Sequence, residues 1–283
     1  MPACDAERPA LQAGLWLVSR DTGRGKAAVR LDGVCAIAVM AKAPRPGHVK
    51  TRLQGLLTAE EAAQIGAAFL ADVTANVSAA AAAAPVHGYV AYAPAGQEAR
   101  FDGVVAPGSR LVLADGALGE APGVEGFGRS LLHAVRTMLG MGYGAACVLN
   151  ADSPTLPTAW LAGAARRLLA PGRRAVIGPA DDGGYWLLGV QTPEPELFSR
   201  IAWSTDAVAA ATSERALGIG LPMDRLGAWF DVDDRAGLQR LVRSLGEPAP
   251  AGGVDAPFAA PATARCVAAL GVRSRLGALA PEP

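Results

Sequence analysis

Hydrophobic residues along this chain form short continuous runs that alternate with longer segments of helical periodicity. A short apolar run without polar interruption is typical of a strand buried on both faces of a sheet. The predicted strands are Val34–Met40, Val86–Tyr92, Ala145–Asn150, Ala175–Pro179 and Tyr185–Val190, with a shorter candidate at Leu111–Leu113. The predicted helices are Thr58–Ala84, Arg129–Leu139, Thr158–Leu169, Thr205–Leu217 and Asp234–Leu245. This alternation predicts an α/β fold with a mostly parallel sheet and helices on both faces.

Polar residues at the starts of these segments predict where the helices begin. Thr58 followed by Glu61 has the spacing of a capping box, in which each side chain binds the backbone N–H of the other residue. The other expected N-caps are Thr158, Ser204 or Thr205, and Asp233 or Asp234.

The pattern divides the 283 residues into one domain and two flanking segments. Strands and helices alternate over residues 34–246, which is ample length for one hydrophobic core. Residues 1–33 are mixed in character and are interpreted as an N-terminal extension. Residues 247–283 are rich in Ala, Pro and Gly, so we expect a tail with little order apart from a short helix near Ala262–Leu270.

Charge and cysteine content exclude several classes of protein. Lys plus Arg and Asp plus Glu are both 26, so the formal net charge is zero and nucleic-acid binding is not expected. No apolar run approaches the ~20 residues that span a bilayer, so no membrane partner is expected. The four cysteines form no C-x-x-C pair, and Cys35 and Cys147 lie in apolar runs. Reduced core cysteines favour a cytoplasmic protein.

The loop over residues 42–52 follows the first predicted strand and carries four cations. Two prolines and Gly47 bend and stiffen this loop, so the cations are held in place. Positive charge at the carboxyl end of a buried strand is typical of a site for nucleotide phosphates, although a solvated basic loop would share the composition. The expected phosphate-binding residues are Lys42, Arg45, Gly47, Lys50, Thr51 and Arg52.

An acidic residue, Asp152, follows the predicted strand Ala145–Asn150. A carboxylate at a strand end, above bound phosphates, is a common ligand of Mg²⁺ or Mn²⁺, which prefer oxygen. The same residue could equally be a turn aspartate that accepts local N–H bonds. The motif by itself favours neither interpretation.

Two further acidic segments are candidates for the reaction. Asp182 lies in a D-D-G-G turn between two predicted strands, which is also a strong hairpin signal. In the segment Trp229–Asp234, alternation places Asp231 and Asp233 on one face and Val232 on the other. One of these acids could be a second metal ligand or a base, and another could simply cap the following helix.

Five motifs in order, from about Val34 to Leu245, carry a family resemblance. They read K-A-P-R-P-G-H-V-K-T-R-L, N-A-D-S-P-T-L-P, G-P-A-D-D-G-G-Y-W-L-L-G, L-F-S-R-I-A-W-S-T and F-D-V-D-D. Together they resemble a bacterial family of glycosyltransferase-like proteins, described as radical-SAM/selenodomain-associated or arsenosugar-biosynthesis transferases. That family belongs to the nucleotide-diphospho-sugar transferase superfamily with the GT-A fold. The K-T-R-L element has a more distant likeness to 2-phospholactate guanylyltransferase.

The resemblance implies a role for each candidate. The cationic loop would hold the nucleotide phosphates, with Lys50 and Arg52 foremost, and Asp152 would bind the metal in the place of the last acid of the GT-A D-x-D motif. Asp182 would face the acceptor. Asp231 or Asp233 would be the second acid near the metal or the acceptor, so the expected catalytic set is Asp152, Asp182, Asp231 and Asp233, with Asp152 and Asp233 as metal ligands.

The chain departs from the family pattern in two places. Asn150 stands where the first acid of D-x-D is expected, so metal binding would depend mainly on Asp152. The helix motif G-x-L-G-x-R appears as Gly126-Phe127-Gly128-Arg129-Ser130, which displaces its arginine by one position, or roughly 100° around a helix.

Three activities fit these features. The resemblance favours a glycosyltransferase that moves a sugar from a nucleotide-sugar to a small acceptor, with Mg²⁺ or Mn²⁺ as cofactor. The number of loop cations favours a nucleotidyltransferase that joins an NTP to a phosphorylated small molecule and releases pyrophosphate, because a triphosphate carries more charge. The missing first acid of D-x-D favours a nucleotide-binding protein without catalysis. Sugar transfer is our expectation.

Overall fold

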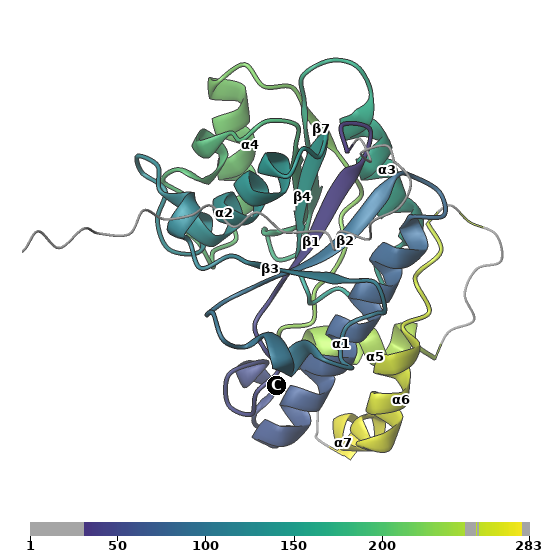
Figure 1. Ribbon diagram of the computed structural model, residues 1–283. Helices are drawn as coiled ribbons and strands as arrows, with labels where there is room; N and C mark the ends of the chain where they lie inside the picture. Colours follow the sequence, from purple (N-terminus) through teal and green to yellow (C-terminus); the bar gives the residue numbers. More distant parts are fainter. Residues whose placement is uncertain (1–30, 247–252, 254, 279–283) are drawn as a thin grey trace, which may run out of the picture.

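The computed structural model describes residues 31–246, 253 and 255–278, so the predictions for residues 1–30 and for the rest of the tail lie outside it. Within the described residues, seven strands form one sheet in the order β3-β2-β1-β4-β6-β5-β7 (Figure 1). Strand β6 runs antiparallel to β4 and β5, and the other neighbouring pairs are parallel. The mostly parallel α/β fold is therefore confirmed. The strands are β1 Cys35–Ala41, β2 Val86–Tyr92, β3 Arg110–Leu113, β4 Ala145–Leu149, β5 Ala175–Pro179, β6 Tyr185–Val190 and β7 Met223–Arg225.

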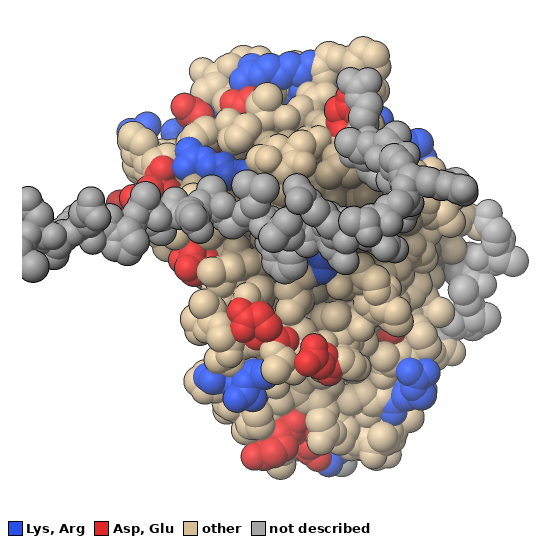
Figure 2. All heavy atoms as spheres, in the orientation of Figure 1, with Lys and Arg blue, Asp and Glu red and all other residues tan. Residues whose placement is uncertain are grey.

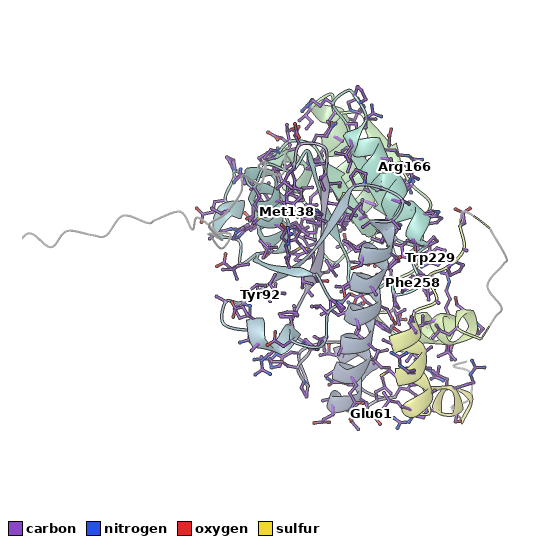
Figure 3. All side chains as sticks on the ribbon, turned by 45° about the vertical axis from the view of Figure 1, so that its right-hand side comes forward. Glu61, Tyr92, Met138, Arg166, Trp229 and Phe258 are labelled. Atoms are coloured by element: carbon purple, nitrogen blue, oxygen red, sulfur yellow. The ribbon has the colours of Figure 1, made fainter. Side chains whose placement is uncertain are left out.

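Helices cover both faces of the sheet, which is why the strand sequences are apolar without alternation. In β1, Cys35, Ile37 and Val39 belong to the core beneath α1 and α3, whereas Ala36 and Ala38 belong to the core beneath α2 and α4. Figure 3 labels Met138 on α2 and Arg166 on α3, on the two sides of the sheet. These helices are α1 Ala59–Ala80, α2 Phe127–Gly140, α3 Thr158–Leu169 and α4 Val208–Gly218.

Three more helices gather beside α1 at one end of the molecule (Figure 1). They are α5 Arg235–Ser244, α6 Pro261–Ala269 and α7 Val272–Ala278, and they share a third core with the first half of α1. The short helix expected near residue 262 is confirmed. The expectation of little order is wrong for the rest of residues 255–278.

Two side chains of α1 hold residues 255–278 against the domain, and the local composition of that segment does not encode either contact. Asp72 on α1 is 2% exposed, and its oxygens accept the backbone N–H groups of Ala262 and Thr263 at 3.0 and 2.6 Å. It therefore caps the start of α6 from 190 residues away along the chain. Arg275 on α7 makes a two-pronged ion pair with Glu61, at 2.7 Å for each contact, and this pairing lowers the pKa of Glu61 to about 2.

The predicted helix starts were partly correct. The Thr58–Glu61 capping box is present, and Asp234 caps α5 by accepting the N–H of Gly237 at 2.8 Å. Thr158 is not an N-cap, because Pro157 takes that position and the Thr158 hydroxyl donates to Asn76 on α1 at 2.6 Å.

Two predicted helix boundaries, the end of α1 and the start of α4, also differ from the structure. Helix α1 ends at Ala80 rather than at Ala84, since the residue before Pro85 is disfavoured in helical conformation and the chain turns instead. Helix α4 starts at Val208, because Ser204 adopts a left-handed conformation with φ of +64°. Neither Ser204 nor Thr205 caps it, as the N-cap is Ala207.

On the face drawn in Figure 2, acidic and basic side chains are interspersed rather than gathered into one basic patch. Among the helices within the described ranges, none combines the length and the apolar character needed to cross a bilayer.

Candidate active site

A cleft of about 610 Å³ lies along the carboxyl ends of β1, β2 and β4. These three strands are parallel neighbours in register, so their following loops meet at one edge of the sheet. The cleft is therefore built by the cationic loop after β1 and the acidic segment after β4, joined by the segment before α5. Of the predicted site residues, its walls contain Lys42, Lys50, Thr51, Arg52, Asp152 and Asp233.

Lys50 lies between the two acids that were predicted to bind metal. Its Nζ is 2.6 Å from Oδ1 of Asp152 and 3.0 Å from Oδ1 of Asp233, and it donates to the carbonyl oxygen of Val232 at 2.7 Å. The backbone of Lys50 is left-handed, with φ of +50°, and its side chain is only 7% exposed. The ammonium group also lies 5.3 Å from the ring centre of Phe69 on α1.

The charges of this trio depend on one another. Burial works against the charged form of Lys50, but the nearby Asp152 and Asp233 outweigh burial and raise the pKa of Lys50. The Asp152 side chain lines the cleft and is 36% exposed. Burial and the proximity of Asp233 raise the pKa of Asp152 against the opposing effect of Lys50.

The rest of the cationic loop divides into two groups. Lys42 and Arg52 are exposed and line the cleft, and neither is ion-paired within the described residues. Arg45 does not line the cleft, although its Nη2 lies 2.9 Å from Nε2 of His48, which does. Gly47 is also outside the cleft lining and supplies the turn, with φ of +77°. The loop thus brings fewer cations to the cleft than its composition suggests.

A second cleft of about 400 Å³ adjoins the first, because Arg52 and Asp233 line both. Its walls carry the acids of the β5–β6 turn and of the segment before α5, including Asp182 and Asp231. The turn position of Asp182 is as predicted, and its Oδ1 accepts the N–H of Gly184 at 2.8 Å. The structure therefore brings Asp152, Asp182, Asp231 and Asp233 to one pair of connected clefts.

Asp231 has the most perturbed acidity among the acids of the second cleft. Burial, together with the negative charges of Asp182 and Asp233, raises the pKa of Asp231 to about 7. A carboxyl group with this pKa is suited to accept a proton near neutral pH.

Two carboxylates in this site converge on one cation position. The position between Asp152 and Asp233 holds the Lys50 ammonium, and carboxylate oxygens are also the ligands that Mg²⁺ prefers. Within the described chain, no three His, Cys, Asp or Glu side chains form a metal site by themselves. A Mg²⁺ or Mn²⁺ ion fits this donor set when substrate phosphates and water complete its ligands.

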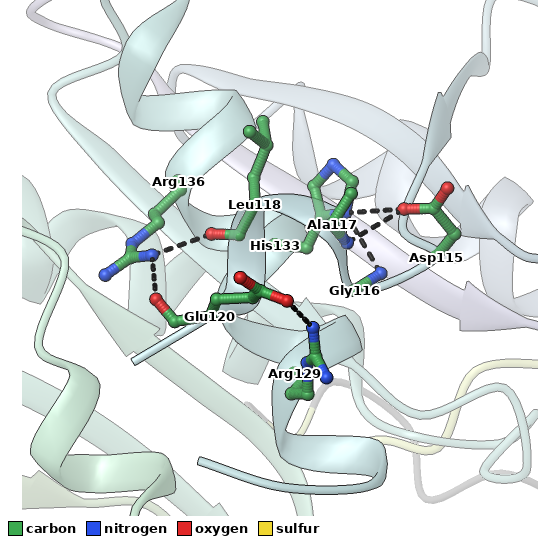
Figure 4. A network of polar contacts seen from close by, with 8 residues as sticks. All are labelled: Asp115, Gly116, Ala117, Leu118, Glu120, Arg129, His133 and Arg136. Atoms are coloured by element: carbon green, nitrogen blue, oxygen red, sulfur yellow. Dashed lines mark hydrogen bonds and ion pairs between the residues drawn. The ribbon is translucent and has the colours of Figure 1, made fainter. Parts of the chain in front are cut away.

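The sequence departs from the family pattern at Asn150 and Arg129, and the structure shows the surroundings of both side chains. The Oδ1 of Asn150, two residues before Asp152, is buried and accepts no hydrogen bond from the described part of the chain. Arg129 does not line either cleft. It forms an ion pair with Glu120 (Figure 4), in a network where His133 accepts the N–H of Gly116 at 3.1 Å. Burial lowers the pKa of His133.

Sequence reasoning missed several residues of the clefts. Arg240 on α5 pairs with Asp181 at 2.5 Å and lies over the Phe230 ring at 4.2 Å, in the lining of the second cleft. No local signal could identify Arg240, because its partner is 59 residues away in the chain. Phe127 lines the first cleft and is 51% exposed. The spacing of apolar residues in the predicted helix does not reveal this exposure.

Aromatic side chains hold the outer parts of this region. Trp203 packs edge-to-face on Phe127 with 5.7 Å between the ring centres. Trp229 contacts Trp160 of α3 in the same geometry at 5.4 Å. These contacts anchor the segments that precede the site residues.

Comparison with known proteins identifies the fold. The profile of a family described as "Uncharacterized protein conserved in bacteria (DUF2064)" matches residues 76–205. No curated protein matches the chain. The crystal structure of a protein from Desulfovibrio desulfuricans G20, provisionally called a nucleotide-diphospho-sugar transferase, is 25% identical. That match covers 85% of this chain and 97% of the other, with a TM-score of 0.68.

Two more distant structures have lower scores. CMP:2-keto-3-deoxy-manno-octonic acid synthetase complexed with CTP is 12% identical over 75% of this chain and 98% of its own, with a TM-score of 0.48. Rv0371c from Mycobacterium tuberculosis H37Rv is 17% identical over 74% of this chain and 97% of its own, with a TM-score of 0.39. The chain is thus similar to DUF2064 over residues 76–205, and its fold is the GT-A-like fold of nucleotide-diphospho-sugar transferases.

Proposed function

We propose that this protein is a divalent-metal-dependent transferase that moves a sugar from a nucleotide-sugar to a small acceptor. The carrying observation is the pair of connected clefts, one with unpaired cations and two convergent carboxylates, the other rich in acids. The first suits the diphosphate of a donor and the second suits the hydroxyl groups of an acceptor. The fold shared with the Desulfovibrio desulfuricans protein supports a nucleotide donor.

The free positive charge in the donor cleft favours a diphosphate over a triphosphate. Lys42 and Arg52 are the loop cations that are free to bind phosphate, whereas Arg45 lies outside the cleft and Lys50 is neutralised by two acids. The cation count that favoured nucleotidyl transfer is therefore reduced. Within sugar transfer, the ordered sequence motifs favour the radical-SAM/selenodomain-associated or arsenosugar-biosynthesis group.

Asp152 and Asp233 are the residues that would hold Mg²⁺ or Mn²⁺. When bound, such an ion supplies positive charge to the departing nucleoside diphosphate. Arg52 and Lys42, in the lining of the same cleft, bind and orient the phosphates, and together they stabilise the charge that develops as the glycosidic bond breaks. This arrangement needs no covalent nucleophile.

Asp231 is the proposed general base. It lies in the second cleft, near Asp233, the one acid that lines both clefts. Its raised pKa of about 7 suits proton removal from an acceptor hydroxyl at neutral pH. Asp182 retains one carboxylate oxygen beyond its bond to Gly184 and would orient the acceptor.

Thermal-shift screening tests the proposal. NTPs and nucleotide-sugars are each added with and without Mg²⁺ or Mn²⁺, and a ligand that binds the folded state raises the melting temperature. The expected result is metal-dependent stabilisation by a nucleotide-sugar, followed by release of a nucleoside diphosphate when an acceptor is supplied. Best stabilisation by an NTP, with pyrophosphate release, would instead indicate nucleotidyl transfer. No stabilisation by either class would leave a fold that has lost the chemistry.

A further inference from the structure

The ammonium group of Lys50 has no donor left for a phosphate. An ammonium carries three N–H donors, and three protein acceptors surround Nζ of Lys50. It donates to Asp233 and to the carbonyl oxygen of Val232 at 3.0 and 2.7 Å, and it is ion-paired with Asp152 at 2.6 Å. The predicted phosphate ligand is therefore fully occupied by protein acceptors. It can reach a phosphate only after it leaves the two acids.

The position of Lys50 is also the position that a metal ion would take. Asp152 and Asp233 converge on Nζ from two segments of the chain, and the same two carboxylates are the proposed metal ligands. An ammonium and a divalent cation repel each other strongly at contact distance within a partly buried site. The two acids can thus neutralise Lys50 or bind the metal, but both together are strongly disfavoured.

We propose that Lys50 is a resident cation that keeps the metal position closed until a nucleotide diphosphate draws its ammonium group away. The inference rests on the proposed function. Lys42 and Arg52, both unpaired within the described residues, attract the diphosphate to the same cleft. The incoming negative charge then competes with Asp152 and Asp233 for Lys50. Nucleotide and metal consequently bind with positive coupling, and each raises the affinity of the other by the same factor.

The surroundings of Lys50 define its closed position and place it beside the other cations of the cleft. Its alkyl chain is buried and its ammonium lies 5.3 Å from the Phe69 ring centre, so the closed position is well defined. The backbone at Lys50 is left-handed, and the loop before it turns at Gly47, through a His48 N–H to Arg45 carbonyl bond of 3.1 Å. The residue lies in the cleft lining with Lys42 and Arg52, so a short movement of the side chain suffices to meet a phosphate.

Mn²⁺ binding to the full chain, followed by electron paramagnetic resonance of the free ion, tests the inference without any activity measurement. Lys50→Met keeps the length of the side chain and removes its charge. Lys42→Met is the matched control, because Lys42 lines the same cleft but contacts neither acid. Without nucleotide, the affinity of Lys50→Met for Mn²⁺ should exceed that of wild type by a factor of about ten or more. Lys42→Met should bind it as wild type does.

A second measurement uses the wild-type chain and so does not depend on the folding of a variant. The sequence contains three lysines, Lys26, Lys42 and Lys50, which makes acetylation by acetic anhydride easy to follow by peptide mass spectrometry. Lys50 should react more slowly than Lys42 in the free protein. Saturating Mn²⁺ alone, or inorganic pyrophosphate alone in metal-free buffer, should change the reactivity of Lys50, and Mn²⁺ should leave that of Lys42 unchanged.

The outcomes separate this inference from the proposed function. The inference is overturned if a folded Lys50→Met variant binds Mn²⁺ no more tightly than wild type, or if Mn²⁺ binds wild type while Lys50 keeps its original reactivity. The proposed function would still stand if a nucleotide-sugar stabilised the wild-type chain. Tighter Mn²⁺ binding by Lys50→Met, with no nucleotide stabilising the wild type, would support the closed metal position and contradict the transferase.

Discussion

The backbone N–H of Val232 donates to the carbonyl oxygen of Asp152 at 2.9 Å. This bond joins the segment after β4 to the segment before α5, and the Ser153 hydroxyl adds a second link to the Phe230 carbonyl oxygen at 3.0 Å. Because Val232 is fully buried, its two neighbours, Asp231 and Asp233, are held on the cleft side. Acids from two distant parts of the chain are thereby held beside each other.

Replacement of Asp152 should remove metal-dependent binding. In Asp152→Ala, stabilisation of the protein by a nucleotide should no longer increase on addition of Mg²⁺ or Mn²⁺, because one of two convergent carboxylates is lost. Melting curves with nucleotide, with and without metal, measure this. Asp224→Ala, at the far strand β7, is the control and should keep the metal effect. Persistence of the metal effect in Asp152→Ala would place the metal elsewhere.

Two arginines of the cationic loop should behave differently. Arg52 lines both clefts, whereas Arg45 lines neither and contacts His48 at the edge of the first cleft. A hydrogen bond to a charged group contributes roughly 1.5–3 kcal/mol, so Arg52→Met should weaken nucleotide binding about ten- to a hundredfold. Arg45→Met should have little effect. Calorimetric titration of both variants measures this, and equal losses would contradict the assignment of the cleft.

Asp231 should make the stability of the protein depend on pH. Its pKa rises from 3.8 to about 7 on folding, so the unfolded chain loses this proton at lower pH than the folded chain does. The contribution of Asp231 to the free energy of unfolding therefore falls as pH rises from about 4 to about 7, and stays low above it.

The Asp231→Asn variant isolates this contribution. It should melt at a higher temperature than wild type at pH 8, because the charged Asp231 of the wild type repels Asp182 and Asp233 there. Near pH 4 the two proteins should melt at similar temperatures. Thermal melting across this pH range is the measurement. The same variant should lose sugar transfer at every pH if Asp231 is the base. A melting difference that did not change with pH would argue against the raised pKa.

The C-terminal helices should depend on Asp72. In Asp72→Ala the two backbone N–H groups at the start of α6 lose a buried acceptor, which costs about 1–3 kcal/mol of unfolding free energy. Urea unfolding measures the loss. Asp72→Asn keeps one side-chain oxygen and should recover part of it. Unchanged stability in Asp72→Ala would mean that α6 contributes little to the folded domain.

The sequence by itself determined the regular elements and the identity of the charged loop. Strand β2, strand β5, strand β6 and helix α3 match their predicted bounds, since burial on both faces and helical periodicity leave a direct mark on local composition. The Thr58 capping box was likewise readable, because its two partners are three residues apart. The order of motifs also placed the chain near the correct fold.

Only the tertiary structure decided which charges face one another. Lys50 meets Asp233 across 183 residues, Arg240 meets Asp181 across 59, and Asp72 caps α6 across 190. No periodicity in the chain encodes such pairs, because they arise from the order of strands in the sheet and from the packing of helices at its edge. The same loop can hold four free cations or two, and the difference depends on carboxylates that the loop itself does not contain.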